Sequence, residues 1–224
     1  MNILALETAT DRCSVALEIS GDLIVRATDE PRVHAGRLLG MTEECLREGG
    51  LKPADVDLLT FGRGPGSFTG VRIATGVVQG LAFGLERLVV PVSTLACMAV
   101  GAWRNHACQK VAVCVDARMG ECYWGTFTVD AAGVATLQGA ELIAEPDSLP
   151  LPGEPGWVGV GTGWDVFPQL AAAAKGCVDR VFPALLPEAR DLIATASAAN
   201  RRGESIPAEQ ALPMYLRDKV AWRS

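Results

Sequence analysis

Apolar and polar positions at the start of the chain predict three consecutive strands. Residues 3–6 form a short apolar run, as in a buried strand. Residues 13–19 alternate between large apolar and small or polar side chains, which is the period-two pattern of a half-buried strand. Gly21-Asp22 suits a two-residue hairpin turn because glycine adopts positive φ freely. Residues 23–28 should therefore return antiparallel to the second strand.

The next part of the chain has the longer hydrophobic period of helices, and it predicts helices that cover a sheet. Residues 68–85 carry an apolar stripe at helical spacing, formed by Val71, Ala74, Val78, Leu81 and Leu85. A helix over 33–48 ends at Gly49-Gly50, a common signal at helix C-termini. The other expected elements of this half are strands at 58–61 and 88–90 and a helix at 94–103. The resulting order, βββαβαβα, is that of a layered α/β unit.

The second half opens on the same plan as the first. A buried strand over 111–115 ends at Asp116, as the first strand ends at Glu7, and a turn, a strand and a hairpin near Ala132-Gly133 follow. Four prolines between 146 and 155 predict a loop. Later elements are a strand at 157–160 and helices at 163–174 and 188–201. This predicts an α/β fold of two similar lobes, each βββαβα-type with a mixed central sheet; the alternative is two unrelated α/β segments that look alike.

The repeat divides the chain into three parts. We expect an N-terminal lobe over residues 1–105, which carries the partner-binding helices, and a C-terminal lobe over 106–205. Residues 206–224 form a last segment that should pack back on the N-terminal lobe.

Composition indicates an acidic globular protein. Hydrophobic residues make up 49% of the chain, enough to offset the ordering entropy of a folded core. The formal net charge of −6 argues against direct gripping of a nucleic-acid backbone, which needs a clustered basic face. The seven cysteines include no Cys-x-x-Cys pair and are expected to be buried free thiols in a reducing compartment. No apolar run is long enough for a signal peptide core or a membrane span, so we expect a cytoplasmic protein without membrane contact.

A glycine-rich loop over residues 62–70 joins a predicted strand to a predicted helix. Its free N–H groups could hold an anion at the helix start, with Arg63 or Arg72 adding positive charge. Its glycine spacing is not that of a P-loop, and it lacks the glycines of a nucleophile elbow. The alternative is a loop that only starts a helix. The candidate anion or nucleotide contacts are Glu7, Arg63, Gly64, Gly66, Ser67 and Asp116.

Groups able to do catalysis are scarce. Glu7, Asp11 and Asp116 end or follow strands and could hold Mg²⁺ near a phosphate, but we favour the interpretation that they cap turns. His34 is followed by Leu38 at i+4, so no helical histidine pair forms. No nucleophile and base can be assembled. We therefore expect no catalytic residue and no metal site.

Five glycines inside the two predicted helices need an explanation. Each costs about 1 kcal/mol relative to alanine in a helix interior. Their spacing at i, i+4 would let another backbone approach closely, which predicts contact with a second chain. The alternative is that the two helices pack on each other. The candidate interface residues are Gly36, Gly40, Gly76, Gly80 and Gly84.

Several segments together resemble a known family. They are residues 3–8 with Asp11, the run Gly-Pro-Gly-Ser-Phe-Thr-Gly-Val-Arg-Ile-Ala-Thr-Gly at 64–76, Pro-Val-Ser-Thr-Leu at 91–95, Asp116-Ala-Arg118 with Tyr123, and Pro-Met-Tyr-Leu-Arg at 213–217. In this order they are similar to the TsaB (YeaZ) family, bacterial accessory proteins of tRNA threonylcarbamoyladenosine synthesis. The first seven residues of the 64–76 run are the most specific match.

The resemblance implies an actin-like, ribonuclease-H-like (ASKHA) fold of two lobes and kinship with TsaD, the catalytic, metal-binding subunit of the same pathway. TsaD-like proteins carry a His-x-x-x-His pair, and this chain has His34 and Leu38 at that place. Actin-like ATPases favour Asp-x-Gly after the first strand, where this chain has Glu7-Thr8-Ala9. Arg118 occupies the glycine-like place after Asp116. These departures argue against ATP hydrolysis by the chain alone.

The implied function is that of a non-catalytic subunit that binds and activates TsaD. The complex would transfer threonylcarbamoyl from threonylcarbamoyl-AMP to N6 of the adenosine 3′ to the anticodon. The resemblance also implies recruitment of the ATPase TsaE, a homodimer in isolation through the same helical face, and contact with tRNA only indirectly. We expect no cofactor held by this chain itself, with ATP or ADP and Mg²⁺ at the interface of the complex. The alternatives are a self-sufficient actin-fold ATPase or small-molecule kinase and, less favoured, a peptidase that acts on TsaD.

Overall fold

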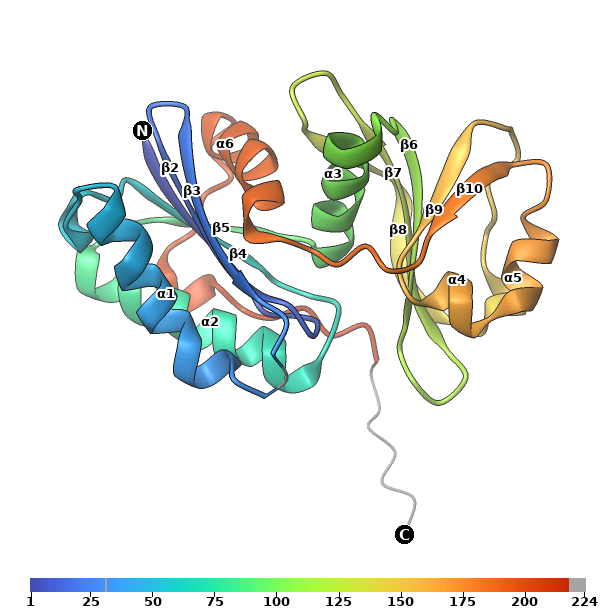
Figure 1. The fold of residues 1–224 in the computed structure, drawn as a ribbon, viewed down its shortest axis with the longest axis horizontal. Coiled ribbons are helices and arrows are strands. Elements are labelled where there is room, and N and C mark those ends of the chain that lie inside the picture. The colour runs from blue at the N-terminus through green and yellow to red at the C-terminus, as the bar shows by residue number, and fades with distance from the viewer. Residues whose placement is uncertain (31, 218–224) are drawn as a thin grey trace, which may run out of the picture.

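Two five-stranded mixed sheets form the framework of the protein in a computed structural model, which describes residues 1–30 and 32–217 (Figure 1). The strands of the first sheet are β1 (Asn2–Glu7), β2 (Cys13–Ile19), β3 (Asp22–Thr28), β4 (Leu58–Gly62) and β5 (Val89–Val92). Those of the second are β6 (Lys110–Asp116), β7 (Cys122–Val129), β8 (Ala135–Ala144), β9 (Trp157–Val160) and β10 (Val178–Phe182).

Helices cover both sheets. They are α1 (His34–Glu48), α2 (Phe68–Leu85), α3 (Thr94–His106), α4 (Gly163–Val166), α5 (Pro168–Ala173) and α6 (Ile193–Arg201). Short 3₁₀ turns are η1 (Pro53–Asp55), η2 (Pro146–Ser148), η3 (Ala189–Leu192) and η4 (Ala208–Gln210).

The two sheets have the same strand order, which confirms the two-lobed actin-like α/β architecture. The first runs β3-β2-β1-β4-β5, and the second, read from its other edge, runs β8-β7-β6-β9-β10. In each, the opening strand pairs antiparallel with the next strand and parallel with the fourth. The second lobe differs in one element. The single turn η2 stands where the first lobe has α1, because prolines at 146, 150, 152 and 155 remove the N–H groups that a helix needs.

Two local predictions were wrong, and one strand was missed. The first hairpin turns at Ser20 and Gly21, both at positive φ, and Asp22 already pairs with Ile19. The helix expected over 163–174 is interrupted at Phe167, before Pro168, because proline restricts the residue that precedes it. Strand β10 was not predicted, since its three central residues are exposed and carry no alternating pattern.

The lobes exchange helices. Helix α3 follows β5 in the chain but packs on β6, β7, β8 and β9, whereas η3 and α6 follow β10 and pack on the first sheet. Figure 1 shows α3 against the second sheet and α6 beside the first. One buried cluster therefore contains residues of both sheets, such as Ile3 and Val113. The division at residue 105 remains a proposal about the chain, and packing of these helices crosses it.

Residues 206–214 run along the N-terminal lobe. Ile206 forms a bridge with Val89, the Gln79 side-chain amide donates to the Ala211 carbonyl at 2.9 Å, and the Met214 N–H donates to the Arg63 carbonyl at 2.8 Å. Of the expected C-terminal segment, residues 218–224 lie outside the described residues.

Helix α2 is 18 residues long and apolar enough to cross a membrane by length and composition alone. One such helix is weak evidence for a membrane protein. Here α2 connects β4 to β5, which are adjacent and parallel in one sheet, and a crossover helix of this kind lies on the sheet that it connects. Its apolar residues therefore include a side that packs on the first sheet and a side that is exposed.

Candidate functional site

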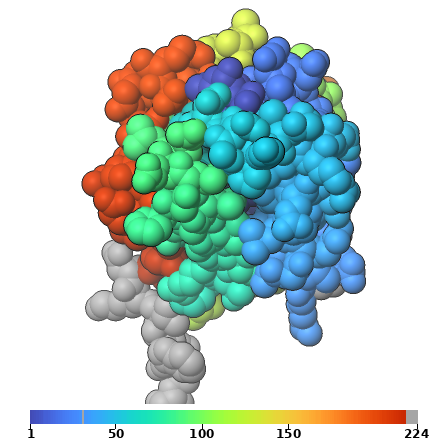
Figure 2. All heavy atoms as spheres, turned by 90° about the vertical axis from the view of Figure 1, so that its left-hand side faces the viewer, coloured from blue at the N-terminus to red at the C-terminus, as the bar shows by residue number. Residues whose placement is uncertain are grey.

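Helices α1 and α2 lie next to each other and form one outer side of the first lobe, the side that faces the viewer in Figure 2. In that view α1 is blue and α2 is green. The buried stripe of α2 includes Val71, Ala74 and Val78, as predicted. We call the opposite, outward surface of the two helices the helical face and define it by Gly36, Leu39, Gly40, Gly76, Gly80, Phe83 and Gly84.

Large apolar side chains stand on this face without cover. Phe83 is 80% exposed and Leu39 is 50% exposed. Leu39 lies in the middle part of α1 and Phe83 in the last turn of α2, and both side chains are largely uncovered by the described residues. The helical face therefore combines small residues with exposed apolar side chains.

All five predicted interface glycines have open space in front of them. A Cβ built on any of the five, Gly36, Gly40, Gly76, Gly80 or Gly84, meets no heavy atom within 4 Å. If α1 and α2 packed on each other through these glycines, the Cβ positions would be filled. Intrachain packing therefore does not explain why glycine occupies these positions.

The C-terminal segment extends the helical face at the start of α2. The Arg72 guanidinium lies 3.3 Å from the ring centroid of Phe68 and 5.0 Å from that of Tyr215. Phe68 is 57% exposed. The guanidinium is attracted electrostatically to the faces of both rings, which links the C-terminal segment to α2.

The glycine-rich loop packs against the β1–β2 turn. A Cβ at Gly66 would lie 2.4 Å from the Ala9 carbonyl oxygen, and one at Gly70 would lie 2.0 Å from the Thr8 carbonyl oxygen. The Ser67 N–H donates to the Ala9 carbonyl at 2.7 Å, and the Ser67 hydroxyl accepts from the Gly70 N–H at 3.3 Å. Glycine is required at both positions because the backbone of the same chain comes too close for a side chain. No ligand is needed to explain these glycines.

Glu7 ends β1 at this loop and is fully buried. Its carboxylate accepts from the Ala9 N–H at 2.6 Å and from the Thr94 hydroxyl at 3.3 Å. Burial outweighs these bonds and raises the pKa of Glu7 from 4.5 to about 7. The residues at this turn do not fit a nucleotide phosphate, because the Ala9 and Ser67 amides already have acceptors and a carboxyl group fills the space beside them.

Arg63 and Gly64, two further candidates in this loop, contact the rest of the chain. The Arg63 guanidinium lies 3.5 Å from the carboxylate of Glu141, on β8 of the other lobe. Ser93, the N-cap of α3, donates to the same carboxylate. Burial raises the pKa of Glu141. The Gly64 carbonyl accepts from the Thr94 N–H at 2.9 Å. Sequence reasoning missed Glu141 because it lies 78 residues from Arg63.

Asp116 caps its own turn at the end of β6. Its carboxylate accepts from the Arg118 N–H at 2.8 Å and lies 3.3 Å from the Arg118 guanidinium. Arg217 covers the same turn and donates to the Ala117 carbonyl at 3.2 Å. Glu7 and Asp116 thus both bond to the turns that follow them, the arrangement favoured from the sequence.

His34 also has a partner within the chain. His34 Nε2 lies 2.9 Å from the Thr10 carbonyl oxygen. Over residues 1–30 and 32–217, no group of three or more His, Cys, Asp or Glu side chains is placed to share a metal ion. All seven cysteines are free, and six of them are buried, which confirms the expected free thiols.

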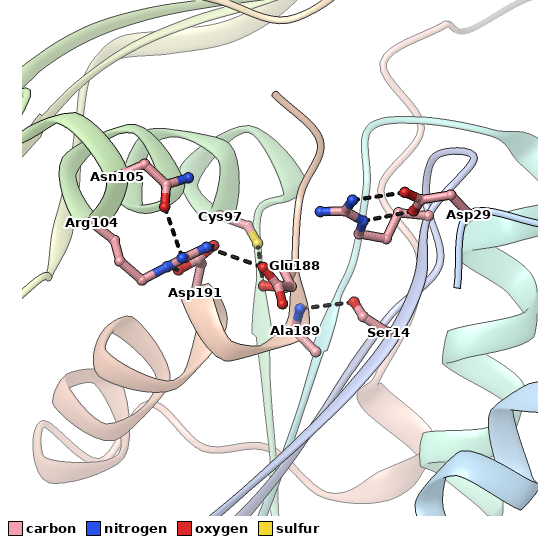
Figure 3. Close-up of polar contacts among 9 residues, drawn as sticks. Ser14, Asp29, Cys97, Arg104, Asn105, Glu188, Ala189 and Asp191 are labelled. Atoms are coloured by element: carbon pink, nitrogen blue, oxygen red, sulfur yellow. Dashed lines mark hydrogen bonds and ion pairs between the residues drawn. The ribbon is translucent and has the colours of Figure 1, made fainter. Parts of the chain in front are cut away.

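A polar cluster at the junction of the lobes was not predicted (Figure 3). Arg104 of α3 makes two hydrogen bonds to Asp191 of η3, at 2.7 and 3.0 Å, and a third to Glu188 at 3.1 Å. The Ala189 N–H donates to the Ser14 hydroxyl on β2 at 2.9 Å. Each contact joins residues more than 80 positions apart, so no local pattern marks them.

Comparison with known proteins gives the family. A family profile described as "TsaD: tRNA N6-adenosine threonylcarbamoyltransferase" matches residues 28–224. The tRNA threonylcarbamoyladenosine biosynthesis protein TsaB of Escherichia coli (strain K12) is 42% identical over 100% of this chain and 97% of its own length. The protein of the same name from Haemophilus influenzae is 36% identical over 100% of this chain and 96% of its own.

Solved structures agree over nearly the whole chain. One described as "YeaZ from Pseudomonas aeruginosa" is 44% identical, has a TM-score of 0.88, and covers 96% of this chain and 99% of its own. Another, described as an uncharacterized protein with similarity to peptidase YEAZ from Pseudomonas aeruginosa, is 44% identical with a TM-score of 0.90 and the same coverage. These matches confirm the resemblance inferred from the sequence. The chain belongs to the TsaB (YeaZ) family and takes part in tRNA threonylcarbamoyladenosine biosynthesis.

Proposed function

We propose that this chain is a non-catalytic subunit that binds TsaD through the helical face and activates it. The complex transfers threonylcarbamoyl from threonylcarbamoyl-AMP to N6 of the adenosine 3′ to the anticodon. The open space at all five helical glycines carries this proposal. Five helix-weakening residues that the fold does not require indicate a reason outside the chain.

A partner with its own helices suits this face. Glycines let a second backbone approach closely, and exposed Phe83 and Leu39 would supply apolar area at the edges of the contact. In the absence of TsaD, a second copy of this chain can use the same surface. Homodimer and heterodimer therefore exclude each other.

The local bonding of the candidate site residues supports an accessory role. Glu7 and Asp116 bond to their own turns, and His34 lies against a backbone carbonyl. These side chains are already engaged in contacts within the chain, so they are not positioned to act as acids, bases or nucleophiles. We accordingly place ATP or ADP with Mg²⁺ at the interface of the complex, and we assign no cofactor to this chain alone.

The remaining components follow from the same proposal. TsaE is recruited by the assembled complex, and tRNA contacts this subunit only indirectly, in keeping with a net charge of −6. The free cysteines suit the cytoplasm, where thiols stay reduced.

The test is association with TsaD after substitution of one glycine. Gly80→Arg places a long side chain in the centre of the helical face, and we expect it to abolish copurification with TsaD and tRNA modification by the reconstituted system. The isolated variant should keep its helical circular dichroism, since the new side chain meets open space. Gly153→Arg is the matched control, because Gly153 is also open but lies in a loop of the other lobe.

Two outcomes would contradict the proposal. If Gly80→Arg copurifies with TsaD as well as Gly153→Arg does, the helical face is not the interface with TsaD. ATP turnover by the purified chain, lost on Glu7→Gln, would favour a self-sufficient ATPase over an accessory subunit.

A further inference from the structure

A concave surface lies at the opposite end of the lobes from the β1–β2 and β6–β7 turns. It is a cavity of about 340 Å³. Its walls come from the β2–β3 hairpin of the first lobe, the β7–β8 hairpin of the second, and η3 with α6 between them. In Figure 1 these two hairpins reach past α6 at the top of the molecule. None of the residues discussed for partner or nucleotide contact lines this cavity.

Two arginines line the cavity without a carboxylate partner. Neither Arg190 nor Arg201 forms an ion pair with any residue that the structure describes. The Nε atom of Arg190 is buried and has no hydrogen-bond acceptor among those residues. Arg201 donates to the Ser197 hydroxyl at 2.8 Å, and Ser197 also lines the cavity. Both arginines line the cavity and neither is neutralised by a carboxylate of the described residues, so an anion that enters the cavity can pair with their guanidinium groups.

The rest of the lining selects the kind of acceptor. Leu23, Val134 and Ile193 supply apolar walls from three different segments. Glu18 is the one carboxylate that lines the cavity, and it limits the negative charge that a ligand can bring. Small ligand sites combine a mostly apolar surface with a few polar groups that fix orientation, and the guanidinium fork matches a carboxylate or phosphate.

We propose that this cavity binds a small organic anion. Its carboxylate or phosphate group would be held by Arg190 and Arg201, and its apolar part would lie against Leu23, Val134 and Ile193. The site is separate from the helical face, so it does not depend on the proposed interaction with TsaD.

The experiment is a titration followed by nuclear magnetic resonance of the arginine Nε–H groups in the full chain. The probes are isovalerate and isopentyl phosphate, which share an apolar part and differ in the anion. Isopentanol and sodium chloride at matched ionic strength are the neutral and ionic controls. We expect a saturable shift of the Arg190 Nε–H signal with at least one of the two anions and none with the controls. The anion that binds more tightly identifies carboxylate or phosphate as the natural group.

Variants decide whether the cavity is responsible. Arg190→Gln and Arg201→Gln should each weaken binding by roughly tenfold or more, which is the usual effect of losing a charged hydrogen bond. Arg202→Gln is the matched control, since Arg202 pairs with Glu204 at the surface and does not line the cavity. If Arg190→Gln fails to fold, Arg201→Gln gives the answer alone. No saturable shift with either anion, or equal binding by the cavity variants and Arg202→Gln, would overturn the proposal.

Discussion

Glu7 is a buried acid whose charge state the fold controls. Its side chain lies between the β1–β2 turn and the start of α3, and burial raises its pKa from 4.5 to about 7. The folded state therefore holds this proton more tightly than the unfolded state does. Its carboxyl group therefore ionises at a higher pH than that of an exposed glutamate.

The first prediction concerns the pH dependence of stability. Because the folded-state pKa is the higher one, the contribution of Glu7 is greatest below about pH 4.5 and is lost as pH rises toward 7. The free energy of unfolding should fall by about 3 kcal/mol over this range, since each unit of pKa difference corresponds to about 1.36 kcal/mol. Glu7→Gln, which stays neutral, should remove this part of the slope. Urea unfolding of both proteins at several pH values between 4.5 and 7.5 measures it, and parallel curves would show that Glu7 does not titrate in this range.

Residue patterns predicted part of the site and missed part of it. Gly80 and the other four helical glycines were recognisable because glycine is unusual inside a helix. Arg63 was recognised as a cation near a glycine-rich loop, but its partner Glu141 belongs to the other lobe. Arg190 and Arg201 gave no signal, since isolated arginines are ordinary surface residues. Phe83 could have been placed on the outer face of α2, because it lies three residues from Gly80.

At the scale of elements, α2 contains glycines of two opposite kinds. Gly70, in its first turn, is buried against the Thr8 carbonyl, whereas Gly80 faces open space. The first glycine is required by the packing of the β1–β2 turn on the helix. The second lowers the stability of the helix, and no packing contact within the described residues requires it. One helix thus serves the fold at its N-terminus and presents the helical face beyond it.

The second prediction compares alanine at these two positions. Gly80→Ala should stabilise the isolated protein by up to about 1 kcal/mol, through helix propensity and a less flexible unfolded chain. Gly70→Ala should destabilise it by roughly 1–3 kcal/mol, because the Cβ would lie 2.0 Å from a backbone oxygen. Thermal unfolding of the two variants under identical conditions gives the sign of each effect. A loss of stability in Gly80→Ala would mean that its surroundings within the chain are filled.

At the scale of the whole molecule, the exchange of α3 and η3–α6 makes the lobes depend on each other. Each sheet is covered on one side by a helix from the other half of the chain. The ion pair of Arg104 and Asp191 connects α3 to η3, the two exchanged segments (Figure 3). The Asp191 side chain is 2% exposed. Burial raises the pKa of Asp191, and its bonds to Arg104 counteract the rise.

The third prediction removes one partner of this pair. Arg104→Ala leaves a buried carboxylate without its cation, and we expect a loss of about 3 kcal/mol at neutral pH. The pKa of Asp191 should then rise further, so the loss should be smaller in acid, where the carboxyl group is protonated. Arg104→Ala combined with Asp191→Asn should recover part of the stability, and this double-mutant cycle separates the pair from the surrounding packing. Equal losses at pH 5 and pH 7.5 would rule out a charge effect.

The sequence by itself determined the strands of both lobes except β10, the helices α1 and α2, the acidic composition and the family. These depend on periodicity, turn residues and short motifs, which are properties of neighbouring positions. The glycine-rich run at 64–76 belongs to this group, and the comparisons agree with it.

Only the tertiary structure decided what the individual groups contact. It placed Glu141 beside Arg63, exchanged α3 and α6 between the sheets, and left Arg190 unpaired in a cavity between two hairpins. It also separated Gly66 and Gly70, which admit the chain's own backbone, from Gly80, which faces open space. The physical reason is that side-chain environment depends on residues distant in the chain, and no local pattern encodes which distant segments meet.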